Sequence, residues 1–171
     1  MIRILGIDPG SRYTGYGIID HERGQSRLVA AGRIVCGDGD IAGRLVKIDA
    51  ELSAILHEYA PGEAAMEQVF VKNNVRSALI LGQARGVALC AVARTAIPVA
   101  EYAPAQIKMA LTGTGRAEKE QVQHMVKILL NLQARMPADA ADALAVALTH
   151  AQVRATLHRV GVAGLRGWGR T

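Results

Sequence analysis

The order in which strand-like and helix-like segments follow one another restricts the fold more than any other feature of this sequence. Three short segments rich in β-branched residues come first, at 2–8, 14–20 and 28–36, with short polar connections between them. Such a series predicts an antiparallel meander. Two further strand segments, at 63–69 and 97–101, alternate with segments of helical spacing. The sequence therefore predicts an α/β domain with a five-stranded sheet of mixed strand direction and helices on both faces.

Five helices are predicted between and after these strands. In the first, Leu45, Ile48 and Leu52 recur at helical spacing, and a Pro-Gly pair at 61–62 ends the helix. The five span residues 40–59, 74–94, 104–111, 117–130 and 137–156. Because no linker or repeat interrupts the pattern, we expect one domain over residues 1–157, followed by a flexible basic tail over 158–171.

The composition predicts an aliphatic core in a reducing compartment. Hydrophobic residues make up 50% of the chain but aromatic residues only 4%, which is typical of helices packed on a sheet and argues against disorder. Cys36 and Cys90 lie in apolar segments, so we expect two small buried residues and no disulfide. No signal peptide and no apolar run near membrane-spanning length is evident, and we expect a cytoplasmic protein without membrane contact.

Basic residues are in excess in the second half of the chain. The whole chain has a net charge of +5. No acidic residue lies between Glu67 and Glu101. The basic residues of that interval are Lys72, Arg76, Arg85 and Arg94. Gathered cations favour a polyanionic partner such as nucleic acid. Solvated helix faces are the alternative explanation for several of these arginines.

The predicted helix at 74–94 carries a small residue at every fourth position. Ala78, Gly82 and Gly86 leave a ridge without large side chains on one face. Two glycines inside a helix cost about 1 kcal/mol each relative to alanine, and close approach of another helix would offset that cost. The other helix belongs either to the same domain or to a second subunit.

Four carboxylates stand where the predicted fold can bring them together. Asp8 ends the first strand and Glu67 lies in the fourth, while Asp139 and Asp142 share one face at the start of the last helix. Taken singly, each has a structural explanation as a turn residue, a solvent-facing strand residue or a helix cap. If strands one and four are neighbours, however, a helix across the sheet gathers all four at one end.

Carboxylates gathered in this way need cations, because they cannot all stay ionised together. Oxygen ligands without nearby His or Cys select magnesium, with manganese as a substitute. Two such ions roughly 3.5–4 Å apart activate the attacking water and stabilise the leaving 3′ oxygen in a displacement at phosphorus. The pattern therefore predicts hydrolysis of a phosphodiester.

Several segments also resemble one known family. They lie at residues 6–11, 66–70, 81–86, 102–104, 112–115 and 139–145, and the last reads Asp-Ala-Ala-Asp-Ala-Leu-Ala. In this order they are similar to the RuvC family of bacterial Holliday junction resolvases, colinearly from residue 4 to about residue 150. The run at 139–145 is specific, whereas the Asp-Pro-Gly turn at 8–10 alone would be weak.

The resemblance implies a ribonuclease H-like fold and a homodimer that cuts four-way junction DNA. It implies that Asp8, Glu67, Asp139 and Asp142 are the catalytic, metal-binding acids, with two magnesium ions per active site. Some relatives have His at the position of Asp139, which is therefore the more replaceable of the pair. The family also implies paired, symmetric cuts with ligatable 5′-phosphate and 3′-hydroxyl ends in recombination and repair, a preference for certain thymine-containing sites, and the partners RuvA and RuvB.

Further residues are expected to bind the DNA. Lys108 and Lys119 match lysines that the family places near the scissile phosphate, where an ammonium would stabilise transition-state charge. The expected contacts after the fourth strand are Phe70, Lys72, Asn73 and Arg76. Phe70 is the only Phe in the chain; it either stacks on an unpaired base or closes the core.

Three other functions remain open on the sequence alone. A ribonuclease H cutting RNA in hybrids would share the fold. The turn at 8–11 also resembles the phosphate loop of actin-like kinases and ATPases, but these need a second domain for which the chain is too short. A junction-binding protein without catalysis is the third, and four intact carboxylates argue against it. The run Thr-Gly-Thr-Gly at 112–115 follows a helix and lacks a third Gly, so it does not indicate a nucleotide site.

Overall fold

A five-stranded mixed sheet forms the centre of the molecule. The structure is a computed structural model of the whole chain, and it describes residues 1–69, 75–134 and 136–159. The strands are β1 (Ile2–Asp8), β2 (Tyr13–Glu22), β3 (Gln25–Val35), β4 (Glu63–Glu67) and β5 (Val99–Tyr102). They lie in the order β3-β2-β1-β4-β5, antiparallel through the meander and parallel from β1 to β4 and from β4 to β5. The predicted meander, mixed sheet and neighbouring first and fourth strands are thereby confirmed.

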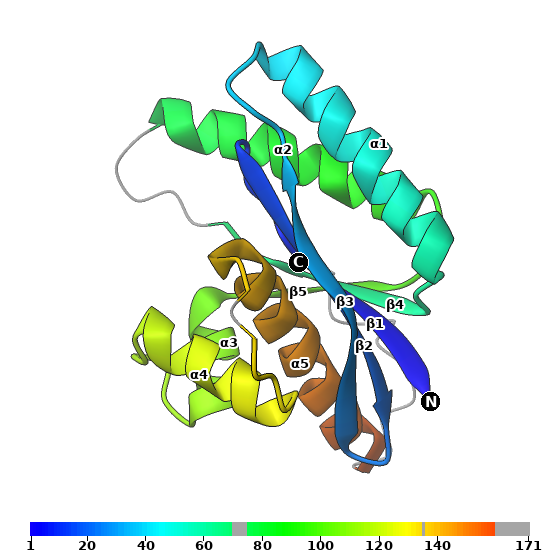
Figure 1. Cartoon of the computed structure of the whole chain (residues 1–171), viewed down its shortest axis with the longest axis vertical. Coiled ribbons are helices and arrows are strands. Elements are labelled where there is room, and N and C mark those ends of the chain that lie inside the picture. The colour runs from blue at the N-terminus through cyan, green and yellow to red at the C-terminus, as the bar shows by residue number, and fades with distance from the viewer. Residues whose placement is uncertain (70–74, 135, 160–171) are drawn as a thin grey trace.

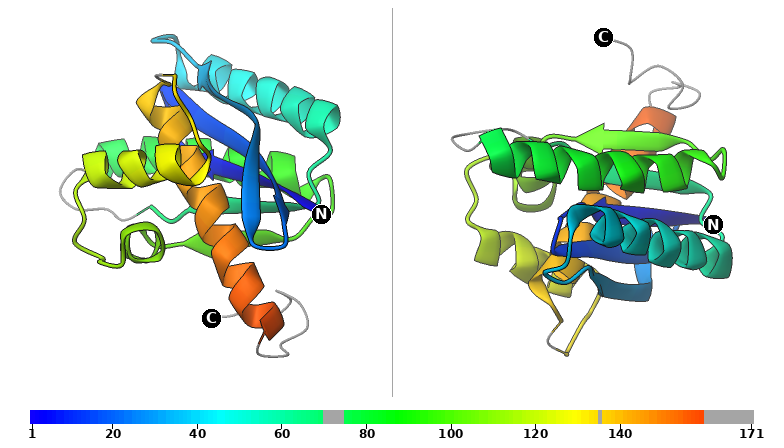
Figure 2. Two further views of the ribbon diagram at one scale, coloured as in Figure 1. Left: turned by 60° about the horizontal axis from the view of Figure 1, so that its bottom comes forward. Right: turned by 90° about the horizontal axis from the view of Figure 1, so that it is seen from above.

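Helices cover both faces of this sheet, as predicted. They are α1 (Ile41–Tyr59), α2 (Val75–Ala93), α3 (Pro104–Thr112), α4 (Lys119–Leu129) and α5 (Ala138–Arg159). In Figure 1, α1 and α2 lie on one side of the strands and α3, α4 and α5 on the other. The two further views in Figure 2 keep this separation, with the long α5 running across the sheet.

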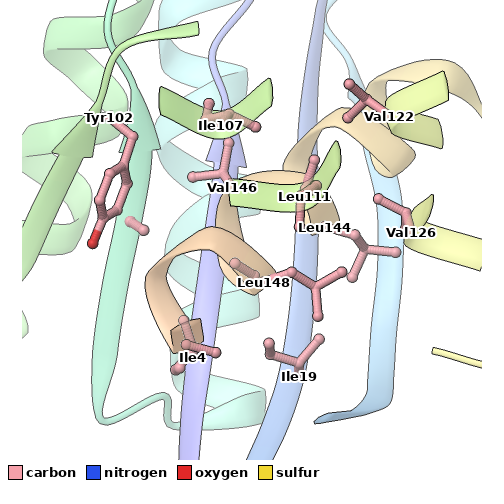
Figure 3. Close-up of a cluster of buried hydrophobic side chains, with 14 of the residues drawn as sticks. Ile4, Ile19, Tyr102, Ile107, Leu111, Val122, Val126, Leu144, Val146 and Leu148 are labelled. Carbon is pink, nitrogen blue, oxygen red and sulfur yellow. The ribbon is translucent and has the colours of Figure 1, made fainter. Parts of the chain in front are cut away.

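Side-chain alternation along the strands divides the core into two layers. Ile4 and Ile19 are fully buried against α3, α4 and α5, together with Leu144 and Leu148 from α5 (Figure 3). The neighbouring strand residues, such as Leu5, are buried against α1 and α2 instead. Because successive strand side chains point to opposite faces, the parity of a residue's position decides which layer it enters.

Glycines of β1 and β2 let the backbone of α5 lie directly against the sheet. A Cβ atom on Gly6 would lie 2.1 Å from the carbonyl oxygen of Ala143, and one on Gly15 would lie 2.0 Å from that of Asp139. Only a residue without a side chain fits at either position. The row of glycines on β1 and β2 therefore determines where along the sheet α5 begins.

Several predicted details need correction. The strand Glu63–Glu67 stops two residues earlier than predicted, and the 99–102 strand begins two residues later. Cys90 is exposed rather than buried, although both cysteines are free as predicted. The helix α5 continues to Arg159, just past the expected boundary at 157, and residues 160–171 lie outside the described residues, so the flexible tail stays a prediction.

The helix α2 corrects the statement that no segment is long and apolar enough for a membrane. Its 19 residues meet that test by length and composition. Two of its apolar residues are largely exposed, Val75 at 71% and Leu79 at 65%. The helix packs on α1 within the domain, and a single helix of this length and composition is weak evidence for a membrane span.

Candidate active site

Two parallel strands bring Asp8 and Glu67 together. In the β1–β4 pair, Ile7 lies opposite Met66, so the next residue of each strand continues the same register. Asp8 is four residues beyond Ile4, and both positions face α5 because the parity is the same. The two carboxylates therefore lie side by side where β1 and β4 end.

The start of α5 brings the other two acids to this end of the sheet. Asp139 and Asp142 stand in its first two turns, three residues apart and on one face. The backbone of Asp139 rests against Gly15 of β2, the strand next to β1. The structure thus gathers all four predicted acids from three elements that are far apart in sequence.

The electrostatics of Asp8 reflect the other acids near it. Burial, followed by the negative charges of Glu67, Asp142 and Asp139, raises the pKa of Asp8 to about 7, although Lys119 opposes the shift. The pKa of Glu67 is also raised, by burial first and then by Asp142. A cation placed among these groups would remove this penalty, which is the condition that a metal site satisfies.

Cationic and amide side chains already contact the α5 acids. The Lys119 ammonium donates a hydrogen bond to Asp142 Oδ2, and the Gln123 amide lies 3.4 Å from Asp142 Oδ1. The Arg33 guanidinium lies 3.8 Å from Asp139 Oδ2. Burial lowers the pKa of Lys119, but its hydrogen bond to Asp142 and the surrounding negative charges outweigh burial and raise it.

The chemistry of the donor set fits hard divalent cations. All four groups are carboxylates, the ligands that magnesium and manganese prefer. In the described ranges, as the side chains are placed, no three His, Cys, Asp or Glu residues converge closely enough to enclose an ion. Two of the four acids point instead toward Lys119 and Arg33. Binding two ions would therefore require these ion pairs to open by rotation of the exposed Lys119 and Arg33 side chains away from the partly buried acids.

A pocket of about 270 Å³ adjoins the carboxylates and contains both predicted lysines. Lys108 from α3 and Lys119 from the start of α4 line it together with Glu67 and Asp142. The Gln121 side chain fixes the first turn of α4. Its Oε1 accepts a hydrogen bond from the backbone N–H of the N-cap residue Glu118 at 2.8 Å. The start of α4, which carries Lys119, is thereby fixed beside the acids. A larger hollow of about 730 Å³ between the β2–β3 hairpin and α5 is lined by no acidic residue and lies apart from this centre.

The remaining predicted DNA contacts are only partly placed. Phe70, Lys72 and Asn73 lie outside the described residues, so the choice between a DNA wedge and a core residue for Phe70 stays a prediction. Arg76 is exposed on the first turn of α2.

A buried polar chain behind the acids was not predicted. The Tyr102 hydroxyl lies 2.8 Å from Nδ1 of the fully buried His150, whose Nε2 lies 2.9 Å from Glu63; Arg154 donates to the same carboxylate at 3.0 Å. Burial opposes ionisation of Glu63, but hydrogen bonds from His150 and Arg154 prevail and lower its pKa. Because an ionised carboxylate can only accept, His150 donates from Nε2 to Glu63.

These contacts join β4, β5 and α5, the elements that carry or flank Glu67 and Asp142. The position of His150, two helical turns beyond Asp142, was the only sequence signal for this series of buried polar contacts. Gln123 had a similar signal, since it follows Lys119 by one helical turn. Arg33 had none, because its place depends on the β2–β3 register.

Comparison with known proteins identifies close relatives. The profile of the family described as crossover junction endodeoxyribonuclease RuvC matches residues 4–150. The chain is 55% identical over 172 residues to crossover junction endodeoxyribonuclease RuvC of Xylella fastidiosa (strain 9a5c), with 99% of each chain covered.

Solved structures agree with this similarity. The fold matches Thermus thermophilus RuvC in complex with a Holliday junction substrate at a TM-score of 0.86 and 33% identity, over 95% of this chain and 98% of that chain. The yeast mitochondrial Holliday junction resolvase Ydc2 matches at a TM-score of 0.67 over 91% of this chain and 80% of that chain; at 16% identity this shows likeness of fold alone.

Proposed function

The chain belongs to the RuvC family of crossover junction endodeoxyribonucleases, and from this we infer that it cuts Holliday junctions with the four carboxylates gathered beside α5. The fold is ribonuclease H-like. The enzyme is a nuclease that hydrolyses phosphodiester bonds in DNA recombination and repair. The placement of Asp8, Glu67, Asp139 and Asp142 at one end of the sheet, by β1, β4 and α5, is the observation that supports the assignment of the catalytic centre.

RuvC nucleases depend on a metal ion, and we assign two magnesium ions per active site here, with manganese as a substitute. Asp8, Glu67, Asp139 and Asp142 would hold them. Two ions supply activation of a water molecule and stabilisation of the leaving oxygen. The raised pKa values of Asp8 and Glu67 support this, because these acids are costly to ionise without added positive charge.

The lysines beside the acids contribute charge toward the DNA backbone. Lys108 and Lys119 face the pocket beside Glu67 and Asp142, where a scissile phosphate would lie. Their ammonium groups would hold phosphate oxygens and stabilise the charge that grows during attack. Water adds to phosphorus and the bond to the 3′ oxygen breaks, which leaves a 5′-phosphate and a 3′-hydroxyl. Phe70, Lys72, Asn73 and Arg76 extend the proposed contact surface.

A homodimer explains the exposed apolar face of α2. Val75, Leu79, Gly82 and Gly86 follow one another at helical spacing, and a Cβ on either glycine would meet no atom within 4 Å. A second copy of α2 could therefore approach closely. A two-fold dimer presents two equivalent centres to two strands of like polarity. RuvA and RuvB are the proposed partners in branch migration, and the cytoplasm is the proposed site of action.

The decisive test is cleavage of a labelled synthetic four-way junction with magnesium or EDTA. The wild-type protein and Asp8→Asn are compared, with Asp49→Asn as a control because Asp49 pairs with Arg94 in the layer of α1 and α2. We expect paired, ligatable, metal-dependent cuts from wild type and the control only, while all three bind the junction. An RNA–DNA hybrid serves as a second substrate. Cutting of the hybrid alone would indicate a ribonuclease H, and binding without any cutting would indicate a junction-binding protein.

A further inference from the structure

We propose that Arg33, supported by Tyr13, binds a DNA phosphate on the β3 side of the active site. This inference rests on the proposed function and adds a contact that neither the family motifs nor the pocket of Lys108 and Lys119 includes. It starts from one observation, that the meander places a guanidinium within 3.8 Å of Asp139.

The β2–β3 register explains why Arg33 lies there. Arg33 pairs directly with Gly15, the residue on which the backbone of Asp139 rests. Because Gly15 has no side chain, the start of α5 and the Arg33 side chain meet over the same point of the sheet. Tyr13, two residues before Gly15, lies on the same face as Gly15, and its ring centre is 4.6 Å from the guanidinium carbon.

This pairing holds the guanidinium in place without using up its donors. A stacked guanidinium keeps its N–H groups in the plane of the fork, free to bind two oxygens of one phosphate. The 3.8 Å separation from Asp139 is too long for a hydrogen bond. The Arg33 side chain is 43% exposed and Tyr13 is 42% exposed, so solvent and DNA can both reach them.

Positively charged side chains lie on both sides of the four acids along the sheet. Lys108 and Lys119 flank the acids on the side of β4, next to Glu67. Arg33 flanks them on the opposite side, at the edge strand β3. A DNA strand lying over the carboxylates would thus have a cation beneath its backbone on each side of the scissile phosphate. Asp139 would turn to its metal ion, and Arg33 would turn to the DNA.

The test measures junction binding at several salt concentrations, in an Asp8→Asn background that prevents cutting. Each phosphate contact contributes about 0.9 to the slope of log K against log salt. Arg33→Ala is expected to reduce that slope by about 0.9 and to weaken binding roughly tenfold at low salt. Arg33→Lys should restore most of the slope, and Tyr13→Phe should leave it unchanged.

Arg27→Ala is the matched control, since Arg27 is an exposed arginine on the same strand that pairs opposite Asp20, far from the acids. Equal losses of slope for Arg27→Ala and Arg33→Ala would overturn the inference, because the effect would then be one of net charge. An unchanged slope for Arg33→Ala would overturn it too, and would leave Arg33 as a neutralising partner of Asp139. Failure of the wild-type protein to bind and cut the junction would instead refute the proposed function.

Discussion

At the scale of single residues, Asp8 carries an energetic cost that its proposed role as a metal ligand would explain. Its pKa is about 7 in the folded protein, against about 3.9 for an ordinary Asp. Between these pH values the folded protein keeps a proton that the unfolded chain has lost. Folding therefore becomes less favourable as pH rises through this window, and the full cost is present above pH 7.

Asp8→Asn should accordingly stabilise the protein when no divalent metal is bound. At pH 8 we expect a gain of about 1–3 kcal/mol in the free energy of unfolding, or roughly 2–10 °C in Tm. At pH 4 the gain should vanish. Thermal unfolding in EDTA measures both, with Asp49→Asn as control. Added magnesium should raise the Tm of wild type but not of Asp8→Asn, and an equal response of the two proteins would contradict the assignment of Asp8 as a ligand.

The same carboxyl group predicts how metal dependence changes with pH. A metal ion must displace the proton of Asp8, so apparent affinity should increase with pH until about pH 7 and then level off. The magnesium concentration that gives half-maximal cleavage should fall about tenfold per pH unit between pH 5.5 and 6.5. Cleavage rates over a magnesium series at four pH values provide the measurement. A half-maximal concentration independent of pH would show that Asp8 does not compete with the metal.

The sequence predicted the positions of those residues that are placed by the pattern of their own strand or helix. Asp8 ends a strand and Asp142 lies one turn into a helix, so their places followed from local patterns. Arg33 and the buried His150 did not, because each acquires its partner only through tertiary contacts: the β2–β3 register for Arg33, and the crossing of α5 over β4 and β5 for His150. The sequence contains no local signal for Arg33, and for His150 the spacing from Asp142 indicates a shared helix face but not the partners Tyr102 and Glu63.

At the scale of elements, the position of α5 depends on the glycines beneath it. Gly6→Ala would place a Cβ 2.1 Å from the Ala143 carbonyl oxygen, which is backbone and cannot move without shifting the helix. We expect a loss of at least about 2 kcal/mol, or roughly 4–8 °C in Tm. Gly39→Ala is the control, because its Cβ would meet no atom within 4 Å. A Gly6→Ala protein as stable as the control would show that α5 does not lie against β1.

The exposed face of α2 gives the second prediction at this scale. Gly82→Ala meets no neighbour within the subunit, so it should strengthen the isolated helix by about 1 kcal/mol. Across a close helix crossing the added methyl groups would collide, and the dimer should dissociate roughly tenfold more readily. Sedimentation over a concentration series measures this. Gly43→Ala in α1 is the matched helical control, expected to leave dimerisation unchanged; an unweakened Gly82→Ala dimer would place the interface elsewhere.

The bounds of the helices and strands were predicted more accurately than the burial of their side chains. Hydrophobic periodicity located all five helices and five strands to within a few residues, because it reflects burial that the chain encodes locally. Exposure on α2 was harder: Cys90 was expected to be buried, and the apolar composition of the helix does not say which face lacks a partner. Only the tertiary structure shows that the Val75–Gly86 face remains open.

At the scale of the whole molecule, the proposed dimer links one chemical centre to a paired reaction. The proposed centre draws its four acids from β1, β4 and α5 of one chain. In the proposed dimer, the second chain would therefore contribute a second centre for the opposing strand rather than residues of the first centre. The order of the sheet, with β1 in the middle, leaves the acids at one open end where a junction arm can lie.

A dimer with one inactive centre separates these two contributions. Wild-type and Asp8→Asn chains with different affinity tags are co-expressed, and the mixed dimer is purified through both tags. Because binding uses surfaces that Asp8→Asn does not alter, the mixed dimer should bind the junction as well as wild type does. Its one active centre should then make single nicks, with paired cuts reduced at least about tenfold, since the second cut would need dissociation and rebinding in the opposite orientation. A mixed dimer of wild-type and Asp49→Asn chains should make paired cuts at the normal rate. Paired cutting by the Asp8→Asn mixed dimer at that same rate would mean that one centre serves both strands, and the two-fold arrangement would then have no catalytic purpose.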